Sequence, residues 1–156
     1  MIKILFSSIL ILLMLNACME KNSEFNTPVT VKDTKIIASL TDTYWKLLSL
    51  NGQAVSLREG EKEVSMVLAS EKSSIRGFSG CNRFFGSFMK NNVNNQQIKF
   101  SKLASTRKMC KDNMQQEREF LKVLSLTTSY KTSAESLFLY NKNNQVIAQF
   151  ESRYMH

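Results

Sequence analysis

Short runs of alternating apolar and polar residues, separated by polar turns, fill most of the chain between residues 41 and 152. This alternation is typical of half-buried strands in an antiparallel sheet. The sequence also supplies turn signals, Asn51-Gly52 after the first run and Asn141 to Asn144 before the last. The predicted strands cover residues 44–50, 64–68, 74–78, 84–89, 98–100, 129–132, 137–140 and 145–150.

One segment, from about Asn113 to Leu126, has the three- and four-residue apolar spacing of an amphipathic helix. Its apolar face consists of Phe120, Leu121 and Leu124. Asp112 is the expected N-cap, with Gln115 at the third helical position. Strands, one helix and further strands predict an α+β, mainly β fold, in which a small curved antiparallel or barrel-like sheet carries one helix packed on it.

The chain has a single histidine, His156, which is its last residue. A Ser-His-Asp triad, a Cys-His pair or a His-rich metal site needs an imidazole inside the folded domain. Glu117 and Glu119 are two residues apart and do not face each other on a helix. Residues 106–108 are interpreted as a solvated basic turn rather than an anion site. We therefore expect no catalytic residues, no metal site and no cofactor, and predict that the protein is not an enzyme.

The N-terminus has the plan of a secretory signal, with Lys3 followed by an apolar run too short for a comfortable membrane span. The end of this run, Leu15-Asn16-Ala17-Cys18, resembles the bacterial lipobox, although Asn16 departs from the usual residue. The resemblance implies a lipoprotein signal peptide over residues 1–17 and acylation of Cys18. The alternatives are an ordinary signal peptide or an uncleaved anchor.

Residues 18–40 are the expected lipidated N-terminus and linker, and the stretch Thr30 to Leu40 has room for an extra strand. The expected location is the cell envelope, with the membrane as a partner through the lipid anchor. Met19 is not aspartate, which favours the outer membrane, facing the periplasm, in a cell with two membranes.

The whole chain has a formal net charge of +8, and removal of residues 1–17 takes away only Lys3 and leaves +7. A basic protein at a bilayer is attracted to anionic headgroups and polymers, and salt screens this attraction. The alternative is that the charge reflects residue usage in the source genome. Nucleic acid is not an expected partner of an exported protein.

Three segments together resemble the META domain, the family that includes the HslJ-like heat-shock proteins. The first is the Gly-rich segment from Gly77 to Gly86, the second runs from Leu103 to Cys110 with Glu117 beyond it, and the third is the hairpin 137–150. The matching motif residues are Gly77, Gly80, Cys81, Asn82, Arg83, Phe84, Gly86, Thr106, Cys110 and Glu117.

This resemblance implies a META domain over residues 41–152, with a barrel-like sheet and one helix. It also implies a secreted or envelope-anchored protein linked to stress tolerance and antibiotic resistance, without catalytic residues. The Gly-rich segment itself is interpreted as a corner that defines the fold, because glycines permit tight bends and Asn82 tolerates a left-handed turn. The other interpretation is a surface for a ligand or partner.

Three functions remain open at this point. The leading hypothesis is a non-catalytic envelope lipoprotein that supports the cell surface under stress through contacts with an unidentified envelope protein. The second is a carrier or sensor of a lipid or other apolar ligand held between sheet and helix, and the third is pilotin-like binding of a partner helix. The rings that would line such a ligand space, or else form the core, are Phe78, Phe84, Phe85, Phe88, Phe100 and Phe120.

Cys81 and Cys110 are the two cysteines left after lipidation. Export places them in a compartment where thiols are readily oxidised, and each has only the other as an internal partner. A disulfide is the leading prediction, and it would fasten the helix start to the sheet. Two buried thiols, or a redox pair, are the alternatives.

Overall fold

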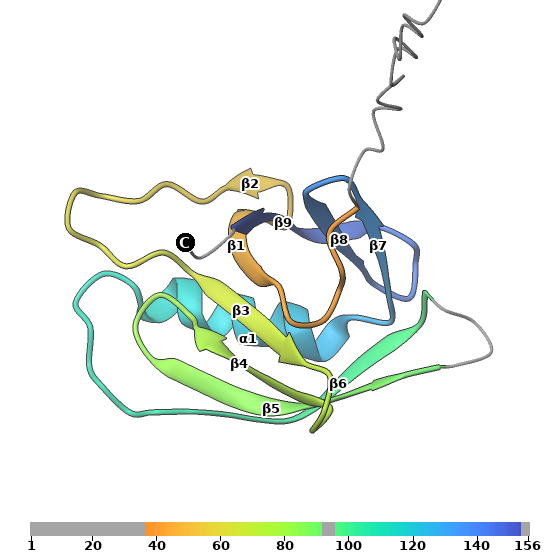
Figure 1. Ribbon diagram of the computed structural model, residues 1–156. Helices are drawn as coiled ribbons and strands as arrows, with labels where there is room; N and C mark the ends of the chain where they lie inside the picture. Colours follow the sequence, from red (N-terminus) through yellow and green to blue (C-terminus); the bar gives the residue numbers. More distant parts are fainter. Residues whose placement is uncertain (1–36, 92–95, 154–156) are drawn as a thin grey trace, which may run out of the picture. The chain divides into compact units, whose positions relative to one another are not determined.

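The structure is a computed structural model, and it describes residues 37–91 and 96–153 (Figure 1). The predicted signal peptide, Cys18 and most of the predicted linker lie outside the described residues. So does most of the stretch Thr30 to Leu40 that has room for an extra strand, and its described part, residues 37–40, is not a strand.

The described part of the chain contains nine strands and one helix. The predicted runs all correspond to strands, with bounds that differ by a few residues. The elements are β1 (Tyr44–Leu50), β2 (Gln53–Ala54), β3 (Ser65–Ala69), β4 (Ser74–Phe78), β5 (Arg83–Lys90), β6 (Ile98–Ser105), α1 (Met114–Leu126), β7 (Ser129–Ser133), β8 (Ser136–Tyr140) and β9 (Val146–Arg153).

Eight strands form one antiparallel sheet in the order β6-β5-β4-β3-β1-β9-β8-β7, and the short β2 pairs with β1. The sheet curls, so its two outer strands meet at one end (Figure 1). There the Tyr130 amide donates to the Gln96 carbonyl at 2.8 Å, and the Ile98 amide donates to the Thr128 carbonyl at 3.1 Å. The predicted fold class, mainly β with a curved antiparallel sheet and one helix, is confirmed.

Helix α1 packs against β6 and β1 and buries one face in the core. Phe120 is fully buried on this face. Its ring makes edge-to-face contacts with Phe84 of β5, at 5.4 Å between centroids, and with Phe150 of β9, at 6.2 Å. One helical side chain therefore joins the two halves of the sheet, which are β6-β5-β4-β3 and β1-β9-β8-β7 in the strand order.

Two irregularities in the sheet explain where the alternating pattern breaks. In β1 the register shifts between Leu47 and Ser49, so Leu50 is buried instead of Ser49. A second shift lies opposite Gly86, where Lys102 has a positive φ of 52°. Strand β6 continues past this bulge to Ser105, whereas the sequence predicts only residues 98–100, because the bulge interrupts the alternation that marks a strand.

The helix begins one residue later than the sequence predicts, at Met114, and ends at Leu126 as predicted. The prediction that Asp112 is the N-cap is wrong. Asn113 occupies that position, and its side chain makes no capping hydrogen bond. Asp112 lies one residue before the N-cap, and its carboxylate pairs with the Arg58 guanidinium at 3.0 Å.

Candidate functional site

The turn between β4 and β5 places two side chains of the Gly-rich motif inside the molecule. The backbone amide and the hydroxyl of Ser79 both donate to the Asn82 carbonyl, at 2.9 and 2.8 Å. Gly80 has a φ of +108°, and a Cβ there would lie 2.8 Å from the Gln116 Oε1 atom of the helix. Only glycine suits this backbone. The tight turn leaves Cys81 and Asn82 almost fully buried.

The side chain of Asn82 uses both of its ends. Its Oδ1 accepts hydrogen bonds from the Thr106 hydroxyl at 2.8 Å and from the Lys108 backbone amide at 2.7 Å. Its Nδ2 donates to Glu117 Oε2 at 2.9 Å and to the Lys108 carbonyl at 3.2 Å. Asn82 therefore joins the β4–β5 turn, the segment after β6 and the helix.

Glu117 is the charged member of this arrangement, and only 6 % of it is exposed. Besides Asn82, the Ser105 hydroxyl donates to its carboxylate at 3.0 Å. A buried carboxylate is tolerated only where hydrogen bonds replace water, and internal donors supply them here. We call Asn82, Ser105, Thr106 and Glu117 the polar cluster.

A disulfide between Cys81 and Cys110 lies beside the polar cluster, with a Cα–Cα distance of 5.8 Å. Of the three interpretations of these cysteines, the structure bears out the disulfide. Cys81 belongs to the turn and Cys110 precedes the helix. The bond therefore fastens the helix start to the sheet, next to the hydrogen bonds that do the same.

Replacing both cysteines, Cys81→Ala together with Cys110→Ala, is expected to lower the free energy of unfolding by about 3.5 kcal/mol. The physical reason is that the bond joins two residues with a sequence separation of 29 and so closes a loop in the unfolded chain. Urea unfolding of the two proteins, each with and without reductant, measures this loss. Reductant should destabilise the unsubstituted protein alone, and equal unfolding midpoints for the two proteins without reductant would contradict the prediction.

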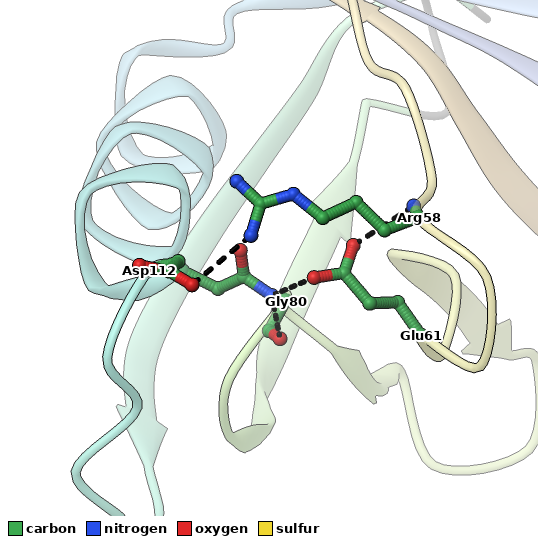
Figure 2. Close-up of polar contacts among 5 residues, drawn as sticks. Arg58, Glu61, Gly80 and Asp112 are labelled. Atoms are coloured by element: carbon green, nitrogen blue, oxygen red, sulfur yellow. Dashed lines mark hydrogen bonds and ion pairs between the residues drawn. The ribbon is translucent and has the colours of Figure 1, made fainter.

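A second set of contacts holds the loop after β2 to the helix start (Figure 2). Arg58 pairs with Asp112, and the Arg58 amide donates to Glu61 Oε2 at 3.1 Å. Asn113 Nδ2 donates to Glu61 Oε1 and to the Gly80 carbonyl, both at 3.4 Å. Both partners of the Arg58–Asp112 pair are more than half exposed, at 69 % and 52 %, so we expect this pair to contribute little stability.

The loop and the helix together border a mainly polar groove of about 740 Å³. Its lining mixes both charge signs and includes Arg58, Glu61, Asp112, Gln116, Glu119 and Lys122. Such a mixed lining selects no particular ligand charge.

A second groove, of about 820 Å³, lies at the other end of the helix. It is bordered by the end of β5, the start of β6, the end of α1 and the β8–β9 turn. Apart from amide and hydroxyl side chains, it is lined by Lys90, Lys99, Lys142, Met89, Ile98 and Leu126. We call it the lysine groove.

The phenylalanines proposed as ligand-lining residues separate into two groups. Phe84, Phe88, Phe100 and Phe120 are buried in the hydrophobic core. Phe85 is 57 % exposed, and Phe78 is half-buried under the Lys62 ammonium, which lies 5.1 Å from its ring centroid. None of the six rings lines either of the two grooves described above.

The remaining motif residues hold the backbone in place. A Cβ at Gly77 would lie 2.0 Å from the Ser65 carbonyl oxygen, so β3 and β4 approach closely there. The Arg83 side chain is exposed, and its carbonyl accepts the Thr106 amide at 2.9 Å. Within residues 37–91 and 96–153, no three His, Cys, Asp or Glu side chains are grouped to hold a metal ion.

The structure brings together Asn82, Thr106 and Glu117, which the sequence singles out separately. Sequence reasoning missed Ser105 and both grooves. Glu117 lies 35 residues from Asn82 along the chain. The one signal for their contact was that all three belong to segments that resemble the same family.

The fold is that of a small, mainly β protein in which a curled antiparallel sheet carries one helix, and in this chain a buried Asn–Glu hydrogen bond and a disulfide hold that helix. The family model of the META domain matches residues 38–154. The chain therefore belongs to the META domain family, as the resemblance of its motifs predicted.

Solved structures have a similar fold. A protein from Burkholderia xenovorans, solved by NMR, is 25 % identical, with a TM-score of 0.57, and the match covers 74 % of this chain and 85 % of that one. The crystal structure of a DUF4847 family protein from Bacteroides vulgatus is 10 % identical, with a TM-score of 0.53, over 75 % of this chain and 96 % of that one. This second likeness shows the fold alone. A search of curated proteins found no match.

Proposed function

We propose that this META domain protein is an exported, lipid-anchored envelope protein that catalyses no reaction and supports envelope integrity, or tolerance of stress or antibiotics, through contacts with other envelope molecules. The observation that carries the proposal is the Cys81–Cys110 disulfide, because structural disulfides persist mainly in oxidising compartments outside the cytosol. The lipobox-like residues before Cys18 supply the mode of attachment.

The polar cluster supports a binding or structural role over catalysis. A general acid or base must reach a substrate proton. Glu117 is instead buried, and its carboxylate accepts from Asn82 and Ser105. Such an arrangement stabilises the fold and leaves the surface free for contacts.

The carrier hypothesis has weaker support, because four of the rings that would line its ligand space are packed in the core. A pilotin-like role rests on fold analogy alone. Native mass spectrometry of the protein purified from its own envelope separates these functions, since it reports bound lipid, bound protein or neither.

Attachment depends on Cys18 in this proposal. In the described part of the chain, no helix is long and apolar enough to cross a membrane. The variant Cys18→Ser is expected to lose acylation, which metabolic labelling with a palmitate analogue and gel mobility both report. Met19→Asp is the matched control, because it keeps the acylated cysteine and should change only the membrane to which the protein is sorted. Unchanged mobility and unchanged membrane fractionation of Cys18→Ser would overturn the lipid anchor.

A further inference from the structure

The lysine groove has a one-sided charge. Lys90, Lys99 and Lys142 line it, and its described lining contains no aspartate or glutamate. Within the described residues, none of these three lysines takes part in an ion pair. The groove therefore favours an anionic occupant.

The helix end that borders the groove does not cancel this charge. The last carbonyls of a helix usually present a partial negative charge. Here the Thr127 hydroxyl donates to the Val123 carbonyl at 2.9 Å, and the Thr127 amide donates to the Leu124 carbonyl at 3.2 Å. The Ser125 hydroxyl donates to the Lys122 carbonyl at 2.7 Å. Hydrogen bonds from these two residues thus occupy three of the carbonyls near the end of α1.

The groove also exposes apolar surface between its lysines. Ile98 is buried, with 2 % exposed, whereas Met89 and Leu126 are 61 % and 52 % exposed. Large side chains exposed to this extent, in one groove that also holds three lysines, mark a binding surface. The occupant that fits has an anionic group for the lysines and an apolar part for Met89 and Leu126.

The residue types favour a lipid over a protein segment. Protein interfaces are enriched in aromatic residues and arginine and depleted in lysine at their centres. The described lining of the groove contains three lysines and neither arginine nor an aromatic residue. Lysines next to exposed apolar side chains are typical of surfaces that rest on anionic bilayers.

We propose that the lysine groove docks on an anionic bilayer, with phospholipid headgroups among Lys90, Lys99 and Lys142 and with Met89 and Leu126 entering the interface. The inference rests on the proposed lipid anchor, which brings the domain to the membrane. The 18 residues between Cys18 and Ile37 span at most about 60 Å, which is enough to let this face turn toward the bilayer.

The test uses the full acylated protein, purified from its own membranes and placed in nanodiscs of phosphatidylcholine with or without phosphatidylglycerol. An amine-reactive ester then labels its lysines, and mass spectrometry measures the rate at each one. In the anionic discs, each groove lysine is expected to react about fivefold more slowly than in the neutral discs, because anionic headgroups hold its ammonium group at the bilayer surface. Lys72, Lys111 and Lys131, which are exposed elsewhere, are the internal controls and should keep their rates.

A matched pair of variants tests the same surface. Lys90→Gln together with Lys142→Gln should restore the labelling rate of Lys99, the groove lysine that remains, in the anionic discs. Lys72→Gln together with Lys131→Gln removes the same charge and should leave the slower labelling of Lys90, Lys99 and Lys142 unchanged. Met89→Gln should shorten the time that the groove stays on the bilayer, so its groove lysines regain most of their labelling rate.

Three outcomes would overturn the docking proposal. Equal slowing at groove and control lysines would indicate attraction by the net charge alone, and no slowing at any lysine would indicate no docking. Protection of the groove by a soluble oligoglutamate peptide, but not by the anionic discs, would assign the groove to an acidic protein segment. Flotation of the discs in high salt reports the lipid anchor separately, so failure of the anchor is distinguished from failure of the groove.

Discussion

Replacement of Asn82 by aspartate is expected to destabilise the fold by about 3 to 5 kcal/mol at neutral pH, because it sets a second carboxyl group against a buried one. The side chain keeps its size, and one oxygen still accepts from Thr106 and Lys108. The other oxygen replaces the amide that donates to Glu117 at 2.9 Å. A favourable hydrogen bond becomes a contact between two acceptors that both prefer to be ionised.

The pH dependence of the Asn82→Asp variant has a definite sign. Repulsion by the facing Glu117 carboxylate raises the pKa of the introduced carboxyl group in the folded variant above its value in the unfolded chain. A raised folded-state pKa contributes stability at low pH and loses it as the pH rises. The loss in free energy of unfolding relative to the unsubstituted protein should therefore be smaller at pH 4 than at pH 7. Urea unfolding at both pH values measures it.

Asn141→Asp is the matched control for this experiment. The Asn141 side chain also accepts two backbone amides, those of Asn143 and Gln145, and donates to the side chain of Gln145 at 3.0 Å. It lies in an exposed turn and faces no carboxylate in these contacts. Its replacement should cost less than about 1 kcal/mol. Equal effects of the two substitutions would show that the contact between Asn82 and Glu117 adds nothing to stability.

Replacement of Phe120 by alanine is expected to lower the free energy of unfolding by about 3 to 5 kcal/mol, as is usual when a large core ring is removed. The ring is fully buried and contacts Phe84 and Phe150 on opposite halves of the sheet. Its loss leaves a cavity where the helix and both halves meet. Thermal unfolding followed by circular dichroism measures the effect.

Leu121→Ala serves as the control on the same helix, because Leu121 is only partly buried against the core. Its truncation should cost clearly less than that of Phe120. A loss below about 1 kcal/mol for Phe120→Ala, together with altered lipid in the purified protein, would indicate that the ring lines a ligand space. Such a result would favour the carrier hypothesis.

The sequence alone determined the strands, the helix and the family. The period of the apolar residues differs between strand and helix. Each period depends only on residues that are close in the sequence, so it is visible without the tertiary structure. The Asn51-Gly52 turn was predictable for the same reason, since both residues have the positive φ that this dipeptide favours, 49° and 79°. The disulfide followed from the number of cysteines, although two other states of the thiols remained open.

Local rules failed where a distant residue supplied the decisive contact. Asp112 is a residue type that favours the N-cap position, but its carboxylate accepts a hydrogen bond from Arg58, 54 residues away. The bulge opposite Gly86 hid the second half of β6, because it interrupts the alternation.

Only the tertiary structure decided the chemistry of the site. In the sequence Glu117 is a helical carboxylate and a motif residue, and its burial follows from the curled sheet, which brings Asn82 and Ser105 to it. The lysine groove likewise joins four segments that are separate in the sequence. Hydrogen bonding and charge complementarity depend on distances between such segments, and the folded sheet fixes those distances.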